Sequence, residues 1–179
     1  SKDVPPKMDL RKFIDQGVWV ISTVYTYLAV TGDYSILDEQ CGYYKLGDNT
    51  VEYSMKRDSV LDHLLCIADF LISNLDEETD CLHALYGDWN DALDGLGKTD
   101  EEGKDFGTGV SVMATMQLYK NCNELVEILS HEKKHADKAN EYKTIAERIE
   151  KGLRTYAIDC DGKGNKKILH GWGDKRGYK

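Results

Sequence analysis

The sequence has few prolines, no long apolar run and no excess of positive charge, and each of these absences excludes a class of protein. Only two prolines occur among 179 residues, so long helices need not be interrupted. The mean hydropathy of −0.53 and the lack of a long apolar run exclude a membrane-spanning helix. The formal net charge is −9, whereas nucleic acids and acidic membrane surfaces favour clustered Lys and Arg. We therefore expect a neutral ligand, no nucleic acid and no membrane partner.

Paired cysteines are also missing. The chain has five cysteines, an odd number, and no two of them form a CxxC pair, which argues against a disulfide framework and a zinc ribbon. We expect reduced thiols and a cytoplasmic protein. With 41% hydrophobic residues, one compact domain can bury a core without a disulfide or a metal.

The two ends of the chain do not look like the natural ends of a domain. The first residues contain neither a starting Met nor an apolar h-region, so we expect the chain to begin inside a longer protein. The last residues follow directly on Gly171-Trp172-Gly173, an unusual place for a domain to stop. The sequence thus indicates a partial domain, truncated at one or both ends.

What the sequence does contain is helical periodicity. Apolar residues recur at three-and-four spacing in four segments, at approximately residues 13–30, 60–74, 110–129 and 136–156. Gly32 follows the first segment, as glycine commonly follows a helix end, and Asp58 or Ser59 can cap the second. The pattern predicts an all-α fold built from helical hairpins.

The segments between these helices are predicted to be irregular. Residues 45–54 form a polar stretch, and the glycine-containing residues 87–109 form a long loop between helices. Residues 161–165 are typical of a turn, followed by a short irregular or β-hairpin C-terminal segment.

The densest chemical signal lies in residues 86–97. Within seven positions this segment holds three carboxylates, an amide and an indole: Asp88, Asp91, Asp94, Asn90 and Trp89. Carboxylates and amides hydrogen-bond sugar hydroxyls, and an indole face can cover a pyranose. If the three aspartates followed successive helical turns, mutual repulsion would raise at least one pKa, as a general acid requires. The alternative interpretation is that Asp88 or Asn90 only caps a helix and Trp89 fills the core.

Gly87-Asp88-Trp89-Asn90-Asp91 resembles the signature of the inverting cellobiose and cellodextrin phosphorylases, glycoside hydrolase family 94. Residues 31–39 resemble a second segment of that family, and His63 lies at a family-like distance before the signature. The resemblance implies that residues 1–179 are part of an (α/α)6-barrel catalytic domain. It assigns the role of general acid to Asp91 and sugar binding to Asp88, Trp89 and Asn90.

The same resemblance implies a reaction and its partners. Asp91 would protonate the glycosidic oxygen of a β-linked glucosyl oligosaccharide while inorganic phosphate, the co-substrate, attacks the anomeric carbon from the opposite face. No other cofactor is implied, and a homo-oligomer is compatible with the full-length enzyme. Two alternatives stay open: an inverting hydrolase, which needs a second carboxylate to activate water, and a non-catalytic module that binds sugar or protein. Two departures from the family pattern, Ala92 and Val110, indicate altered substrate contacts.

Other motifs are interpreted as structural. Residues 131–135 match the zinc motif HExxH, but Lys133 and Lys134 would repel the cation, so we expect a solvated charge cluster and no metal. Residues 159–162 lack the ligands of a calcium loop and predict an ordinary turn. Residues 99–105 form either a solvated loop or a lid beside the sugar site.

Overall fold

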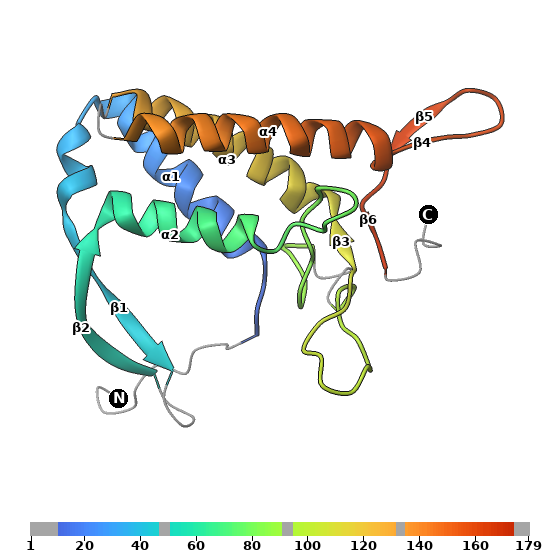
Figure 1. Cartoon of the computed structure of the whole chain (residues 1–179), viewed down its shortest axis with the longest axis horizontal. Helices are drawn as coiled ribbons and strands as arrows, with labels where there is room; N and C mark the ends of the chain where they lie inside the picture. The colour runs from blue at the N-terminus through green and yellow to red at the C-terminus, as the bar shows by residue number, and fades with distance from the viewer. Residues whose placement is uncertain (1–10, 47–50, 91–94, 132–134, 174–179) are drawn as a thin grey trace.

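The computed structural model describes residues 11–46, 51–90, 95–131 and 135–173. Within this part of the chain the fold is mostly helical (Figure 1). Its helices are α1 (Asp15–Thr31), a short 3-10 helix η1 (Tyr34–Asp38), α2 (Val60–Ile72), α3 (Val112–Ser130) and α4 (Ala136–Tyr156). The four predicted helical segments are confirmed, and their ends differ from the predicted ends by only a few residues.

Local capping explains where these helices begin and end. α1 ends at Gly32, which adopts a left-handed φ of 65° and donates its backbone N–H to the Leu28 carbonyl oxygen. α2 begins with a capping box, because the Ser59 hydroxyl accepts the Asp62 N–H while the Asp62 carboxylate accepts from the Ser59 backbone. α3 begins at Ser111, whose side chain accepts the Ala114 N–H. A glycine after a helix and a serine before one are capping signals that can be recognised in the sequence.

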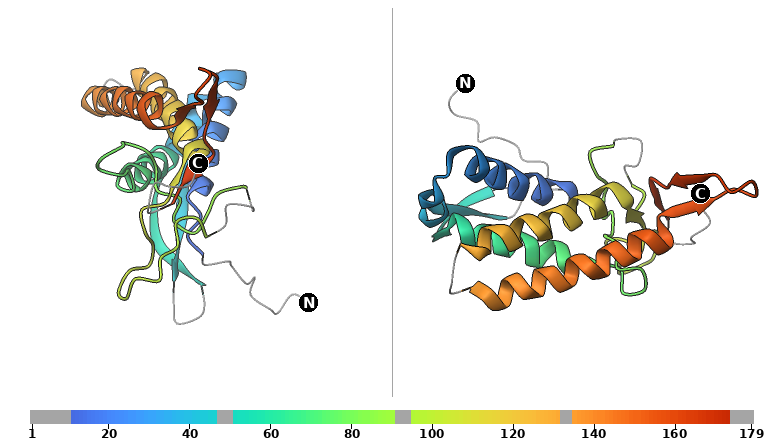
Figure 2. Two further views of the ribbon diagram at one scale, coloured as in Figure 1. Left: turned by 90° about the vertical axis from the view of Figure 1, so that its right-hand side faces the viewer. Right: turned by 90° about the horizontal axis from the view of Figure 1, so that it is seen from above.

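The helices alternate in direction and share one core. α3 lies between α1 and α4, and α2 lies on one face of this layer and contacts α1 (Figure 2). Large buried side chains come from every helix: Ile21, Leu64, Leu71, Leu118, Leu125, Ile128, Tyr142 and Ile149. This alternation agrees with the predicted helical hairpins.

A β-hairpin lies between α1 and α2, where the sequence predicted only a polar stretch. Strand β1 (Gln40–Leu46) pairs antiparallel with β2 (Val51–Ser59), and the register shifts between Gly42 and Tyr44. Such an irregularity disturbs the period of two that identifies a strand in a sequence, which explains why the hairpin was missed. The all-α prediction is therefore too narrow, although the fold is mostly helical.

The C-terminal segment forms two further strand pairs. β4 (Ile158–Cys160) and β5 (Lys166–Ile168) make a hairpin whose turn is closed by Asp161, since its carboxylate accepts the backbone N–H groups of Lys163 and Asn165. The predicted turn is confirmed, but the hairpin strands lie on both sides of it, whereas the sequence predicted an irregular or β-hairpin segment after it. β6 (Gly171–Trp172) then pairs with β3 (Val110–Ser111), which brings the chain end beside the start of α3.

No helix in the described ranges combines the length and the apolar character needed to cross a bilayer.

Candidate active site

The site is built around residues 86–97, which we call the signature loop. This loop gathers with the start of α1, the start of α3 and strand β6 at one end of the helices, opposite the β1–β2 hairpin (Figure 1). On one side, the Tyr86 N–H donates to the Lys12 carbonyl oxygen at 2.9 Å and the Ile14 N–H donates to the Gly87 carbonyl oxygen at 3.0 Å. The first residues of the loop are thus held by backbone hydrogen bonds against the chain just before α1.

On its other side the loop is tied to the segment that leads into α3. The Ala84 N–H donates to the Gly109 carbonyl oxygen at 2.8 Å, and the Gly107 N–H donates to the Gly97 carbonyl oxygen at 2.7 Å. The Gly95 N–H also bonds the Tyr86 carbonyl oxygen at 2.5 Å. The two ends of the loop therefore lie side by side.

Glycine is required where these segments touch. A Cβ at Gly97 would collide with the Leu85 carbonyl oxygen, and a Cβ at Gly109 would collide with the Leu96 carbonyl oxygen. The glycines that the sequence shows around the signature permit close backbone contact between the loop and its neighbours.

Asp88 is the buried member of the predicted sugar-binding group. Its side chain is 2% exposed. One carboxylate oxygen accepts the Ser111 hydroxyl and the other accepts the Asn90 backbone N–H at 2.8 Å. The segment is not helical at residues 88–90, so Asp88 does not start the predicted helical row of aspartates.

The other predicted residues have contrasting positions. Trp89 is 61% exposed, which contradicts the alternative that its indole fills the core. Asn90 is half-buried beside Asp88. Asp91, the predicted acid, lies outside the described residues together with Ala92 and Asp94. In the three residues directly before Asp91, the structure thus combines a buried carboxylate, an exposed indole and a half-buried amide.

A cluster of aromatic and cationic side chains holds the start of the signature loop. The Arg11 guanidinium lies 4.7 Å from the centre of the Tyr86 ring and donates to its hydroxyl at 3.0 Å. The Lys98 ammonium lies 4.8 Å from the same ring centre, and the Phe13 ring meets Tyr86 edge-on at 5.0 Å. Sequence reasoning missed this cluster because its members come from three separate segments.

Ser111 is a second residue that the sequence analysis undervalued. It caps α3 and also bonds the Asp88 carboxylate, and a Ser directly before an apolar helix is a signal that could have identified it. Its neighbour Val110, a departure from the family pattern, is fully buried in a small apolar cluster with Cys81, Val112 and Trp172.

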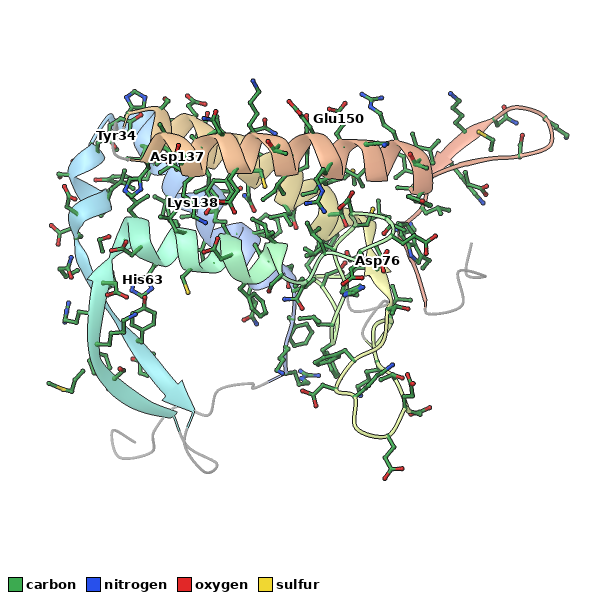
Figure 3. All side chains as sticks on the ribbon, viewed as in Figure 1. Tyr34, His63, Asp76, Asp137, Lys138 and Glu150 are labelled. Carbon is green, nitrogen blue, oxygen red and sulfur yellow. The ribbon has the colours of Figure 1, made fainter. Side chains whose placement is uncertain are left out.

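The turn between α2 and the loop carries a carboxylate with a shifted pKa. Asp76 lies in this turn (Figure 3) and accepts both the backbone N–H and the hydroxyl of Thr79, at 2.9 and 2.7 Å. His83 Nε2 lies 3.5 Å from the other carboxylate oxygen. Burial opposes ionisation, but the Thr79 hydrogen bonds and His83 outweigh it and lower the pKa of Asp76.

The cysteines and histidines do not assemble into a metal centre in the described ranges. All five cysteines are free thiols, as expected, and burial raises the pKa of Cys81 and Cys122 to about 12. His63 stacks on Tyr43 with ring centres 4.2 Å apart. The three central residues of the HExxH match lie outside the described part of the chain, and His131 packs on the Tyr34 ring.

Comparison with known proteins places these features in a family. The family model described as glycosyl hydrolase 94 superfamily, catalytic domain, matches residues 7–177. The chain is 32% identical over 154 residues to solabiose phosphorylase of Paenibacillus borealis, which covers 86% of this chain and 18% of that protein. It is 28% identical over 146 residues to 3-O-beta-D-glucopyranosyl-beta-D-glucuronide phosphorylase of the same organism, covering 81% of this chain and 17% of the relative.

A third relative is N,N'-diacetylchitobiose phosphorylase of Vibrio furnissii, 25% identical over 148 residues, or 83% of this chain and 16% of that protein. The chain spans less than a fifth of the length of each of these relatives. Since the family match extends over nearly the whole sequence, the chain belongs to the glycosyl hydrolase 94 superfamily, within the region that forms its catalytic domain.

Proposed function

We propose that the full-length protein containing this chain is a glycoside phosphorylase that cleaves β-linked glucosyl oligosaccharides with inversion of configuration. The observation that carries the proposal is the signature Gly87-Asp88-Trp89-Asn90-Asp91 within a chain whose family match extends over residues 7–177. The three relatives described above are phosphorylases, which supports the same activity.

The proposed reaction is a single displacement. Asp91 donates its proton to the glycosidic oxygen, while an oxygen of inorganic phosphate attacks the anomeric carbon from the opposite face. The bond from that carbon to the glycosidic oxygen breaks, and its electron pair goes to the departing oxygen. A β-linked substrate therefore gives an α-configured sugar 1-phosphate and a shortened sugar. Phosphate is already an anion, so the step needs no protein base and no other cofactor.

Trp89 and Asn90 are suited to bind the sugar. The 61% exposed indole of Trp89 can cover the apolar face of a pyranose, and the Asn90 amide can bond its hydroxyls. The N–H of Asn90 is fixed by Asp88 at 2.8 Å, which holds this part of the loop in place ahead of the acid.

We also propose that the described helices are part of an (α/α)6 barrel. An exposed apolar strip on one side of α1 supports this placement, and its members Trp19, Val20, Tyr27 and Val30 are between 40% and 80% exposed. Further helices of the domain would cover such a strip. A cytoplasmic location and a homo-oligomer stay predictions of the sequence.

Two other functions are compatible with the residues of the signature loop. An inverting hydrolase would use the same acid but needs a second carboxylate that activates water across the sugar. A non-catalytic module would bind sugar through Trp89 and Asn90 without turnover.

Replacing the acid separates catalysis from binding. In the full-length protein, we expect Asp91→Asn to lower kcat by at least about 100-fold, because the leaving oxygen loses its proton donor. Sugar affinity, measured by titration calorimetry, should be retained because the side chain keeps its size. Asp137→Asn, at an exposed position in the first turn of α4, is the matched control and should keep full activity. Unchanged turnover in Asp91→Asn would refute the assignment of the acid.

A further inference from the structure

The burial of Asp88 calls for a structural explanation. A carboxylate that is 2% exposed loses its hydration, and such a loss is costly unless the charge is paired or well hydrogen-bonded. Within the described part of the chain, the two groups that hold this carboxylate are uncharged: the Ser111 hydroxyl and the Asn90 N–H. Both oxygens are therefore occupied inside the protein.

The Ser111 hydroxyl connects Asp88 to the positive end of α3. It accepts the Ala114 N–H at 3.1 Å and donates to Asp88. The first N–H groups of a helix carry partial positive charge. Because the Ser111 hydroxyl accepts one of them, it becomes a better hydrogen-bond donor to the Asp88 carboxylate. Asp88, a residue of the signature loop, is thus hydrogen-bonded to the N-cap residue of α3.

Ser111 itself is held firmly. Its N–H donates to the Leu82 carbonyl oxygen at 3.0 Å, and its own carbonyl oxygen accepts the Thr115 hydroxyl at 2.6 Å. Thr115 in turn accepts the Leu82 N–H at 2.8 Å. Ser111 and Thr115 are both fully buried, so the partner of Asp88 has little freedom to move.

The second oxygen of Asp88 acts on the loop. By accepting the Asn90 N–H at 2.8 Å, it closes a local Asx-type turn and sets the direction of the chain immediately before Asp91. One carboxylate therefore connects a rigid helix end to the backbone that carries the acid.

We propose that Asp88 is a positioning residue and not a sugar-binding one: through Ser111 it fixes the signature loop against the N-terminus of α3, so that Asp91 meets the glycosidic oxygen. This inference rests on the proposed function for its effect on turnover. The link between Asp88 and Ser111 rests on geometry alone. The positioning role replaces sugar binding, the role that the sequence resemblance assigned to Asp88.

The test is a double-mutant cycle in the full-length protein, with Asp88→Asn, Ser111→Ala and the double variant. A misplacement of about 1 Å can cost about 100-fold in rate, so we expect each single variant to lower kcat by about 10- to 100-fold with little change in KM. The double variant should lose no more than either single variant, since the two residues act as one unit.

Ser59→Ala is the matched control. Ser59 caps α2 as Ser111 caps α3, but its carboxylate partner is Asp62 in the first turn of α2 and not a residue of the signature loop. This variant should lose a comparable amount of thermal stability and keep its kcat, assayed well below the melting temperature. A role of Ser111 limited to helix stability would instead leave kcat unchanged in both variants under these assay conditions.

Three results would overturn the inference: a raised KM for the sugar with unchanged kcat in Asp88→Asn, unchanged kcat in Ser111→Ala, or additive losses in the double variant. Failure of the proposed function appears separately, as wild-type protein that gives no phosphate-dependent product. In that case the melting temperatures of the same three variants are compared. Additive shifts would overturn the Asp88–Ser111 link, and non-additive shifts would support it.

Discussion

At the scale of single residues, hydrogen-bonded carboxylates hold the turns around the signature loop. Asp76 closes the turn after α2 on Thr79, and Asp88 joins the loop to Ser111. The sequence shows where the two aspartates are, but it does not show which residues they bond. Ser111 lies 23 positions from Asp88, and Arg11 lies 75 positions from Tyr86, so only the fold brings these pairs together.

The pH dependence of stability should reveal Asp76. Its pKa is lowered in the folded state, so its ionised form contributes stability above the unfolded pKa of about 3.9, and this contribution is lost as the pH falls through the lower folded pKa. We expect Asp76→Asn to reduce the free energy of unfolding by about 1 kcal/mol at pH 7. The difference from wild type should shrink below about pH 4.

Urea unfolding of the wild type and the variant across this pH range provides the measurement. Glu77→Gln, an exposed neighbour in the same turn, is the control and should change little at any pH. A difference between Asp76→Asn and wild type that does not depend on pH would contradict the account.

At the scale of elements, helices could be predicted and the first β-hairpin could not. The signals for α1, α2 and α4 are local: apolar spacing, the Ser59 cap of α2 and the glycine after α1. The β1–β2 hairpin depends instead on a register that shifts between Gly42 and Tyr44. Strand β6 depends on pairing with β3, which lies about sixty residues earlier in the chain. Neither pairing leaves a periodic trace in the sequence.

The C-cap of α1 gives a prediction at this scale. Gly32 has a φ of 65° and open space around its Cα, so an added methyl group meets no neighbour but forces a left-handed conformation. We expect Gly32→Ala to lower the free energy of unfolding by about 1 kcal/mol. Gly162→Ala is the matched control, because Gly162 also has open space but no positive φ.

Thermal or denaturant unfolding of the two variants separates the strain of the left-handed backbone from any general effect of adding a methyl group in a turn. If Gly162→Ala were destabilised as much as Gly32→Ala, the left-handed cap would not be the cause.

At the scale of the whole molecule, the sequence predicted the family, and the comparisons confirm it. The barrel and the use of phosphate are proposals about the full-length protein, since this chain spans less than a fifth of the length of each relative. The signature loop contains the proposed acid, Asp91, whereas the choice between phosphate and water as nucleophile depends on residues that the signature does not contain.

The most direct measurement tests whether cleavage of the sugar requires inorganic phosphate. Full-length protein is incubated with a panel of β-linked glucosyl disaccharides, with and without inorganic phosphate, and the products are followed by ³¹P and ¹H NMR. We expect an α-configured sugar 1-phosphate, formed only when phosphate is present. Release of free sugar at the same rate without phosphate would contradict the central claim and identify a hydrolase.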